Sequence, residues 1–118
     1  MIKKLTLVLA LATGTASANT SPTTAEIARM DGDADYVSHI RLCALLAARN
    51  GDSMRNKFAR SIEAEYQTKY SNEPYFNAKL TEDLDTRMSA LDTERRINAY
   101  WKGCKGGLDQ LLYNSVNG

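Results

Sequence analysis

The stretch TERRINAYWKGCKGGLDQLLYNS, residues 93–115, decides the fold of this chain. Apolar or small residues recur in it at steps of three or four, at Ile97, Trp101, Cys104, Leu108, Leu111 and Ser115. This spacing places them on one face of a helix, and Tyr100 and Leu112 widen that face. We therefore expect a C-terminal helix that packs on several neighbouring helices.

Residues 1–18 have the pattern of a secretory signal peptide. Lys3 and Lys4 are followed by a short apolar run, and Ala16-Ser17-Ala18 forms a small-residue cleavage site before Asn19. The apolar run is shorter than the roughly 20 residues that span a bilayer, and no cysteine follows the cleavage site for lipid attachment. We expect residues 19–118 to be one exported domain, periplasmic or secreted, without a stable membrane anchor.

The composition of residues 19–118 excludes two classes of partner. Removal of 18 residues from 118 leaves 100, which is the size of one domain. Without Lys3 and Lys4 the chain has 13 basic and 14 acidic residues, a net charge of −1. Interspersed charges with this balance argue against binding to nucleic acid, and also against a polybasic membrane-surface role.

The chain has two cysteines, and in an exported protein two cysteines most simply form one disulfide. Cys43 and Cys104 each lie on an apolar face of a predicted helix, 61 positions apart. The chain-entropy estimate for closing such a loop is about 4 kcal/mol. A pair of free buried thiols is the alternative, and zinc is excluded because two cysteines and one distant histidine do not supply four ligands.

Hydrophobic spacing predicts helices throughout the rest of the domain. Thr23 to Glu26 fit a capping box for a short helix that ends at the interruption 31–33, where Asp33 or Asp35 could cap the next helix. That next helix carries a wide apolar surface, which is typical of the centre of a bundle, and it ends at Asn50-Gly51. Its apolar residues are Tyr36, Val37, Ile40, Leu42, Cys43, Ala44, Leu45, Leu46, Ala47 and Ala48.

Two more helices are predicted before the C-terminal one. The first begins with Ser53 as its cap and repeats large residues every four positions, at Met54, Phe58, Ile62, Tyr66 and Tyr70. The turn 71–74 follows, and the next helix carries Phe76, Leu80, Leu84, Met88 and Leu91. Asp92 or Thr93 then caps the C-terminal helix. No segment has a strand-like period of two, so we predict an all-α fold, a bundle of four to five helices held by the disulfide Cys43–Cys104.

Two glycine-containing motifs have structural interpretations. Gly103, Gly106 and Gly107 lie within a helical pattern, where they predict either a close approach of two helices or a kink. The acidic run 31–35 imitates the start of a calcium loop, but loop positions 6 and 12 would be Tyr36 and Leu42 instead of glycine and glutamate. We expect an acidic turn there and no metal.

No catalytic constellation is visible. His39 is the only histidine, and no serine motif accompanies it, so a half-buried or surface histidine that forms hydrogen bonds is expected. The many carboxylates fit solvated helix faces better than a catalytic pair. We therefore predict a protein that is not an enzyme and that has no cofactor.

Aromatic residues mark the candidate binding region. Tyrosine and arginine are enriched in the residues that dominate binding energy at protein interfaces. Four aromatic rings surround the turn at Pro74, with two basic residues nearby. The candidate partner-binding residues are Arg60, Tyr66, Lys69, Tyr70, Tyr75 and Phe76.

The layout resembles that of two classes of exported bacterial helical bundles. A signal peptide, one cysteine on an early helix and another on the last are features of periplasmic immunity proteins against type VI secreted amidases. They are also features of the pilotin chaperones of type II secretion, whose C-terminal halves are similar to residues 87–92 and 102–105. The resemblance implies no individual functional residue.

The sequence as a whole favours an exported protein-binding module, such as an inhibitor, an immunity protein or a secretion chaperone or adaptor. Its partner would be another protein, such as a toxin or an envelope component, and a homodimer is also open. The alternative is a carrier that holds a small apolar ligand in a cavity between helices.

Overall fold

The computed structural model describes residues 21–117 and confirms an all-α fold. Four helices follow one another, α1 (Thr24–Arg49), α2 (Ser53–Lys69), α3 (Pro74–Ser89) and α4 (Glu94–Asn117). Within this range there is no strand, and no helix is long and apolar enough to cross a membrane. The predicted signal peptide, residues 1–18, lies outside the described residues.

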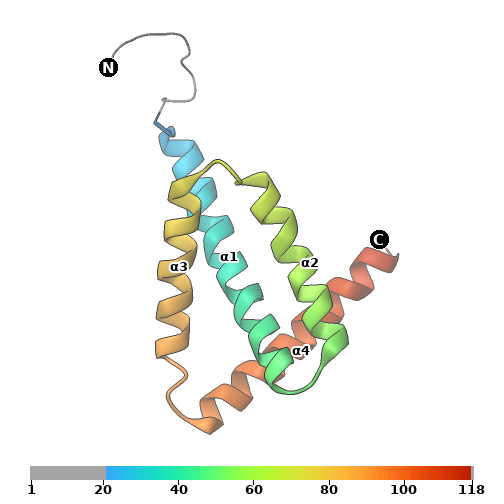
Figure 1. Cartoon of the computed structure of the whole chain (residues 1–118). Helices are drawn as coiled ribbons and strands as arrows, with labels where there is room; N and C mark the ends of the chain where they lie inside the picture. The colour runs from blue at the N-terminus through green and yellow to red at the C-terminus, as the bar shows by residue number, and fades with distance from the viewer. Residues whose placement is uncertain (1–20, 118) are drawn as a thin grey trace.

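Helix α1 is the centre of the fold. It lies between α2 and α3 in one layer, and α4 crosses this layer at the end where α1 stops (Figure 1). The chain runs along α1, returns along α2 and runs forward again along α3, so that α1 packs against all three other helices. The wide apolar surface of residues 36–48 is thereby explained, because a central helix needs apolar side chains on most of its circumference.

The prediction of a short first helix that ends at residues 31–33 is wrong, because α1 continues through them. Gly32 costs a helix about 1 kcal/mol relative to alanine. The burial of Met30 and Ala34, which are 3% and 0% exposed, favours continuation. Asp31 and Asp33 do not cap a helix, and their carboxylates instead accept hydrogen bonds from Tyr75 and Tyr70.

The remaining helix ends largely agree with the sequence. Thr23 and Glu26 form the predicted capping box, with Thr23 Oγ1 accepting from the backbone N–H of Glu26 at 3.1 Å. Gly51 has a φ of 70°, the left-handed conformation expected after α1. Asp52, and not Ser53, caps α2, because its carboxylate accepts from the backbone N–H of Arg55 at 3.1 Å. Thr93 caps α4 in the same way.

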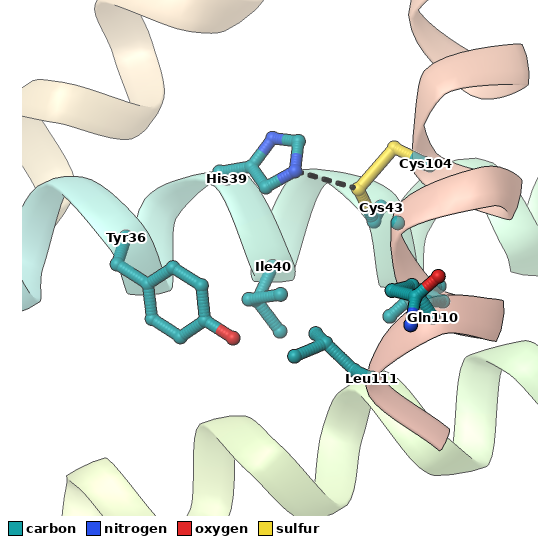
Figure 2. A pocket seen from close by; sticks show the side chains of 9 residues that line it. Tyr36, His39, Ile40, Cys43, Cys104, Gln110 and Leu111 are labelled. Atoms are coloured by element: carbon teal, nitrogen blue, oxygen red, sulfur yellow. Dashed lines mark hydrogen bonds between the residues drawn. A yellow bond between two sulfur atoms is a disulfide. The ribbon is translucent and has the colours of Figure 1, made fainter. Parts of the chain in front are cut away.

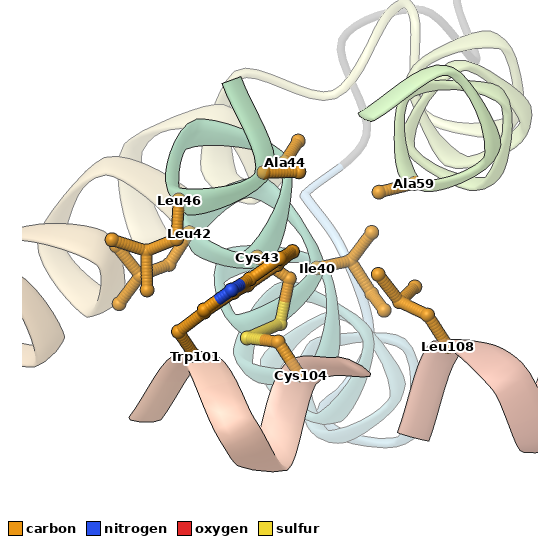
Figure 3. Packing of buried hydrophobic residues seen from close by; sticks show 10 residues of the cluster. Ile40, Leu42, Cys43, Ala44, Leu46, Ala59, Trp101, Cys104 and Leu108 are labelled. Carbon is orange, nitrogen blue, oxygen red and sulfur yellow. A yellow bond between two sulfur atoms is a disulfide. The ribbon is translucent and has the colours of Figure 1, made fainter. Parts of the chain in front are cut away.

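Two groups of buried residues form the core. One, which we call the turn core, lies beneath the α2–α3 turn and contains Met30, Ala34, Val37, Tyr70, Phe76 and Leu80. The other, the crossing core, lies where α4 crosses α1, and Trp101, Cys104 and Leu108 of α4 point into it (Figure 3). The predicted disulfide Cys43–Cys104 is present there, with the two Cα atoms 5.4 Å apart.

Candidate functional site

The structure divides the six candidate partner-binding residues among different environments. Tyr70 and Phe76 belong to the turn core, with 7% and 0% exposure, and their rings stack at a centroid distance of 4.3 Å. They belong to the same buried cluster as Met30 and Ala34 of α1. These two rings therefore belong to the interior of the domain and do not form its surface.

Tyr66, Lys69 and Tyr75 remain partly or fully exposed around the same turn. The Tyr75 hydroxyl donates to Asp31 at 2.6 Å, and this hydrogen bond raises the pKa of the phenol. The Lys69 ammonium lies 5.9 Å from the ring centroid of Tyr66 and also contacts Asp33. These polar groups tie the α2–α3 turn to α1.

Arg60 lies apart from the aromatic turn, and it borders a different surface. A recess of about 310 Å³ between α1 and α2 is lined by Arg41, Ala44, Leu45, Arg60 and Glu63. Arg41 and Glu63 form an ion pair across this recess. Among residues 21–117, no carboxylate lies within ion-pair distance of Arg60.

A second recess adjoins the first one at Leu45. Its volume is about 360 Å³, and it is lined by Leu42, Leu45, Leu46, Arg49, Met88, Leu91 and Ile97. Leu45 and Met88 are 46% and 48% exposed, although both are large apolar side chains. We call the two recesses together the Leu45 groove. Its floor is α1, and its sides are α2 and the junction of α3 with α4.

A third recess, of about 270 Å³, lies beside the disulfide. Its lining includes Tyr36, His39 and Ile40 of α1, Gln110 and Leu111 of α4 and the two cysteines. In Figure 2 the ring of His39 points toward the disulfide, and Tyr36 and Ile40 point toward Leu111. Gly107 and Leu108 complete the lining. We call this the disulfide recess. A Cβ atom built on Gly107 meets no atom within 4 Å, so the recess is open on that side.

The three glycines around Cys104 do not serve a close helix approach, which is one of the two predicted alternatives, and they do not break α4, which is the other. A Cβ atom at Gly103 or at Gly106 also meets nothing within 4 Å, and α4 runs unbroken through all three positions. Cys104 reaches Cys43 from the buried side of α4, where the glycines do not lie. The effect of Gly107 is to leave one wall of the disulfide recess without a side chain.

A chain of hydrogen bonds leads from α3 to the disulfide. An Arg87 Nη donates to Tyr100 Oη at 3.2 Å, and Tyr100 Oη lies 2.6 Å from His39 Nδ1. His39 Nε2 in turn lies 3.6 Å from Cys43 Sγ, as the dashed line in Figure 2 shows. Burial lowers the pKa of His39, and the charge of Arg87 lowers it further, while burial raises the pKa of Tyr100.

The expectation of a half-buried, hydrogen-bonded His39 is confirmed, but its partners were not foreseen. The neighbours in sequence, Asp35 and Arg41, pair elsewhere, with Arg87 and Glu63. The sequence contains one indication that His39 and Tyr100 lie close together. His39 and Tyr100 each lie four residues before a cysteine, so a disulfide between those cysteines brings the two preceding helical turns together.

The described residues contain no group of three side chains suited to a metal ion. The acidic run 31–35 is helical and not a loop, so a calcium loop is absent there.

Comparison of the chain with protein-family models, with curated proteins and with solved structures finds no match.

Proposed function

We propose that this chain is an exported, non-enzymatic protein-binding module that holds its partner in the Leu45 groove. The observation that carries the proposal is the exposure of two large apolar side chains in a mostly apolar groove, Leu45 on its floor and Met88 on its side. Exposed apolar patches rimmed by polar side chains commonly mark interaction sites. The disulfide and the predicted signal peptide support export.

The shape of the groove favours a helix as its occupant. Its floor is one helix and its sides are formed by others, so that a further helix could pack on α1 between them. Figure 1 shows α2 and α3 on either side of α1. An amphipathic helix binds such grooves through apolar residues spaced by three and four positions. One such residue would fit on each side of Leu45, in the two recesses of about 310 and 360 Å³.

The charges around the groove indicate which helix would bind. Arg41, Arg49 and Arg60 border it, and two of them are neutralised by Glu63 and Glu94. Within the described part of the chain, Arg60 forms no ion pair, so a carboxylate beside the apolar stripe of the partner would complement it. The proposed partner is thus an acidic amphipathic helix of another protein, such as a toxin or an envelope component.

The roles of inhibitor, immunity protein and secretion chaperone or adaptor all use such a surface. A carrier of small ligands is less well supported, because the three recesses described above open to solvent, whereas ligand pockets enclose most of their ligand.

The test compares two variants that place the same charge on the surface. Leu45→Glu puts a carboxylate in the groove, and Met54→Glu puts one on α2 outside it, at a residue that is 59% exposed. Tagged residues 19–118 carrying either change would be used to capture partners from an envelope extract, and the affinity of any captured protein would then be measured by calorimetry.

We expect a stoichiometric partner that binds the wild-type chain and Met54→Glu, and whose affinity for Leu45→Glu falls about 100-fold or more, as for a central interface residue. Arg60→Glu should weaken the same complex and make it less sensitive to salt. A partner that binds Leu45→Glu as tightly as the wild type would refute the proposal that the Leu45 groove is the binding site. Sedimentation of the two variants shows in parallel whether the occupant is a second copy of the chain.

A further inference from the structure

The donors and acceptors in the hydrogen-bond chain that ends at the disulfide assign one tautomer to His39. A guanidinium has only donors, so Tyr100 Oη accepts from Arg87 and its own proton is free to be donated to His39 Nδ1. A neutral imidazole that accepts at Nδ1 carries its proton on Nε2. That N–H faces Cys43 Sγ at 3.6 Å, and a disulfide sulfur can only accept.

Further hydrogen bonds hold Arg87 in the orientation in which it donates to Tyr100. Its Nε donates to Ser38 Oγ at 2.9 Å, and an Nη donates to the Asp35 carboxylate at 2.9 Å. The Ser38 hydroxyl donates in turn to the backbone carbonyl of Asp35 at 2.7 Å. Three groups on α1 and α4 therefore fix one side chain of α3, and the depressed pKa of His39 agrees with a neutral ring.

The two sulfur atoms differ in their surroundings. Both cysteines line the disulfide recess, with 0% exposure for Cys43 and 1% for Cys104. Among residues 21–117, Cys43 Sγ has a hydrogen-bond donor beside it, His39 Nε2, and Cys104 Sγ has none. In thiol–disulfide exchange the sulfur that is better stabilised as a thiolate leaves faster, and the other one is attacked.

We propose that the Cys43–Cys104 disulfide is a site of reaction with low-molecular-weight thiols, with Cys104 as the sulfur attacked and Cys43 as the leaving group. The thiolate of the small molecule forms a bond to Cys104 Sγ while the Cys43–Cys104 bond breaks. The electron pair of that bond goes to Cys43 Sγ, whose thiolate is stabilised by the Nε2–H of His39. A second small thiolate then releases Cys104 and leaves as part of the symmetrical small disulfide. The recess of about 270 Å³ limits the reagent to a small molecule.

The first experiment identifies the sulfur that is attacked. The native oxidised chain is treated with 2-mercaptoethanol, quenched with acid, alkylated and mapped by mass spectrometry. We expect the mixed disulfide on Cys104 and the alkyl group on Cys43, in an excess of about tenfold, the size of one hydrogen bond to a charged group. Equal labelling of the two cysteines, or a mixed disulfide mainly on Cys43, would overturn the proposal.

The second experiment uses two tyrosine variants of α4 that each lose one hydroxyl. Tyr100→Phe removes the donor to His39 Nδ1, whereas Tyr113→Phe removes a hydroxyl from a side chain that is 62% exposed and does not line the recess. We expect the second-order rate constant of reduction to fall several-fold, up to about tenfold, in Tyr100→Phe and to stay at the wild-type value in Tyr113→Phe. Equal rate constants in both variants would contradict the proposal that the hydrogen-bond chain through Tyr100 and His39 promotes the reaction.

A third comparison tests access through the recess, and it separates reaction in the folded state from reaction after unfolding. Gly107→Leu fills the open wall, and Gly106→Leu adds the same side chain to an exposed position of α4 that does not line the recess. Gly107→Leu should slow reduction, and Gly106→Leu should not. A rate that becomes independent of thiol concentration and equals the unfolding rate measured in urea would show that only the unfolded chain reacts, and it would refute the proposal.

Discussion

Arg55 on α2 binds Asp109 on α4 through two parallel hydrogen bonds. The Nε–Oδ1 distance is 3.0 Å, and the Nη2–Oδ2 distance is 2.8 Å. A third nitrogen of Arg55 donates to Asp52, the residue that caps α2. The same guanidinium thus links the start of α2 to α4, and it supplements the disulfide that links α4 to α1.

Asp109→Asn should lower the midpoint of thermal unfolding modestly, because it removes the charge from a bidentate pair at the surface. Hydrogen bonds from Arg55 lower the pKa of Asp109, so its stabilising contribution is present above the ordinary pKa of 3.8 and is lost as the pH falls through the lower folded-state value. Urea unfolding of both proteins at pH 7 and below pH 3.8 checks this. A difference that grows in acid would contradict the assignment.

Replacing both cysteines by alanine should lower the free energy of unfolding by about 4 kcal/mol, because the disulfide closes a loop of 61 positions. The measurement is urea denaturation followed by circular dichroism, with the oxidised wild type as reference. An unchanged midpoint would show that the unfolded chain gains little freedom from the loss of the bond.

Phe76→Ala should cost about 3–5 kcal/mol of stability, the range for removing a fully buried phenylalanine. Tyr75→Ala is the matched control on the adjacent residue, whose side chain is 37% exposed and loses one hydrogen bond. Chemical denaturation of both variants should give a much larger loss for Phe76. Similar losses would mean that the turn core does not depend on this ring.

Gly103→Ala and Gly106→Ala should each stabilise the domain by up to about 1 kcal/mol, because alanine favours helix and neither position has a neighbour that the added Cβ would meet. Thermal unfolding of the single variants and of the double variant measures the effect. A loss of stability would show that another element approaches these glycines after all.

The imidazole of His39 should titrate below the ordinary value of 6.5, because burial and Arg87 both disfavour its charged form. Since the unfolded chain then binds the proton more tightly, stability should fall as the pH drops from about 6.5 through the folded-state pKa. His39 is the only histidine of the chain, so its ring protons can be followed by NMR without assignment ambiguity. A pKa above 6.5 would contradict a neutral ring beside the disulfide.

The helices and the disulfide could be predicted because their signals are local or compositional. The stripe on α4, the capping box at Thr23 and the left-handed Gly51 each depend on neighbours in sequence. The continuity of α1 through residues 31–33 could not be predicted. It depends on hydrogen bonds from Tyr70 and Tyr75, at a distant turn, to Asp33 and Asp31. Long-range burial there outweighs the local preference of glycine and aspartate for a turn.

The candidate sites were harder to predict than the fold. Leu45 was expected on the apolar surface of the central helix, but its exposure depends on the directions in which α2, α3 and α4 leave α1 uncovered. The spacing of apolar residues along the sequence does not determine the angles at which the helices cross. Of the aromatic residues around Pro74, periodicity placed Tyr70 and Phe76 on apolar helical faces, yet it could not tell which rings the core would take.

The disulfide joins two parts of the domain that differ in how extensively they pack, the layer of α1, α2 and α3 and the single helix α4. α1 packs extensively on α2 and on α3, whereas α4 meets α1 and α2 only near its crossing point. The packing of α2 and α3 on α1 does not involve the bond, so its reduction should loosen α4, which then depends on its side-chain contacts alone, before it affects the other three helices. The amide protons of α4 should therefore exchange with solvent long before those of the three-helix layer once the bond is reduced, and at a similar rate while it is intact. We therefore expect the last helix to behave as a cooperative unit of its own, with a local stability that depends on the disulfide.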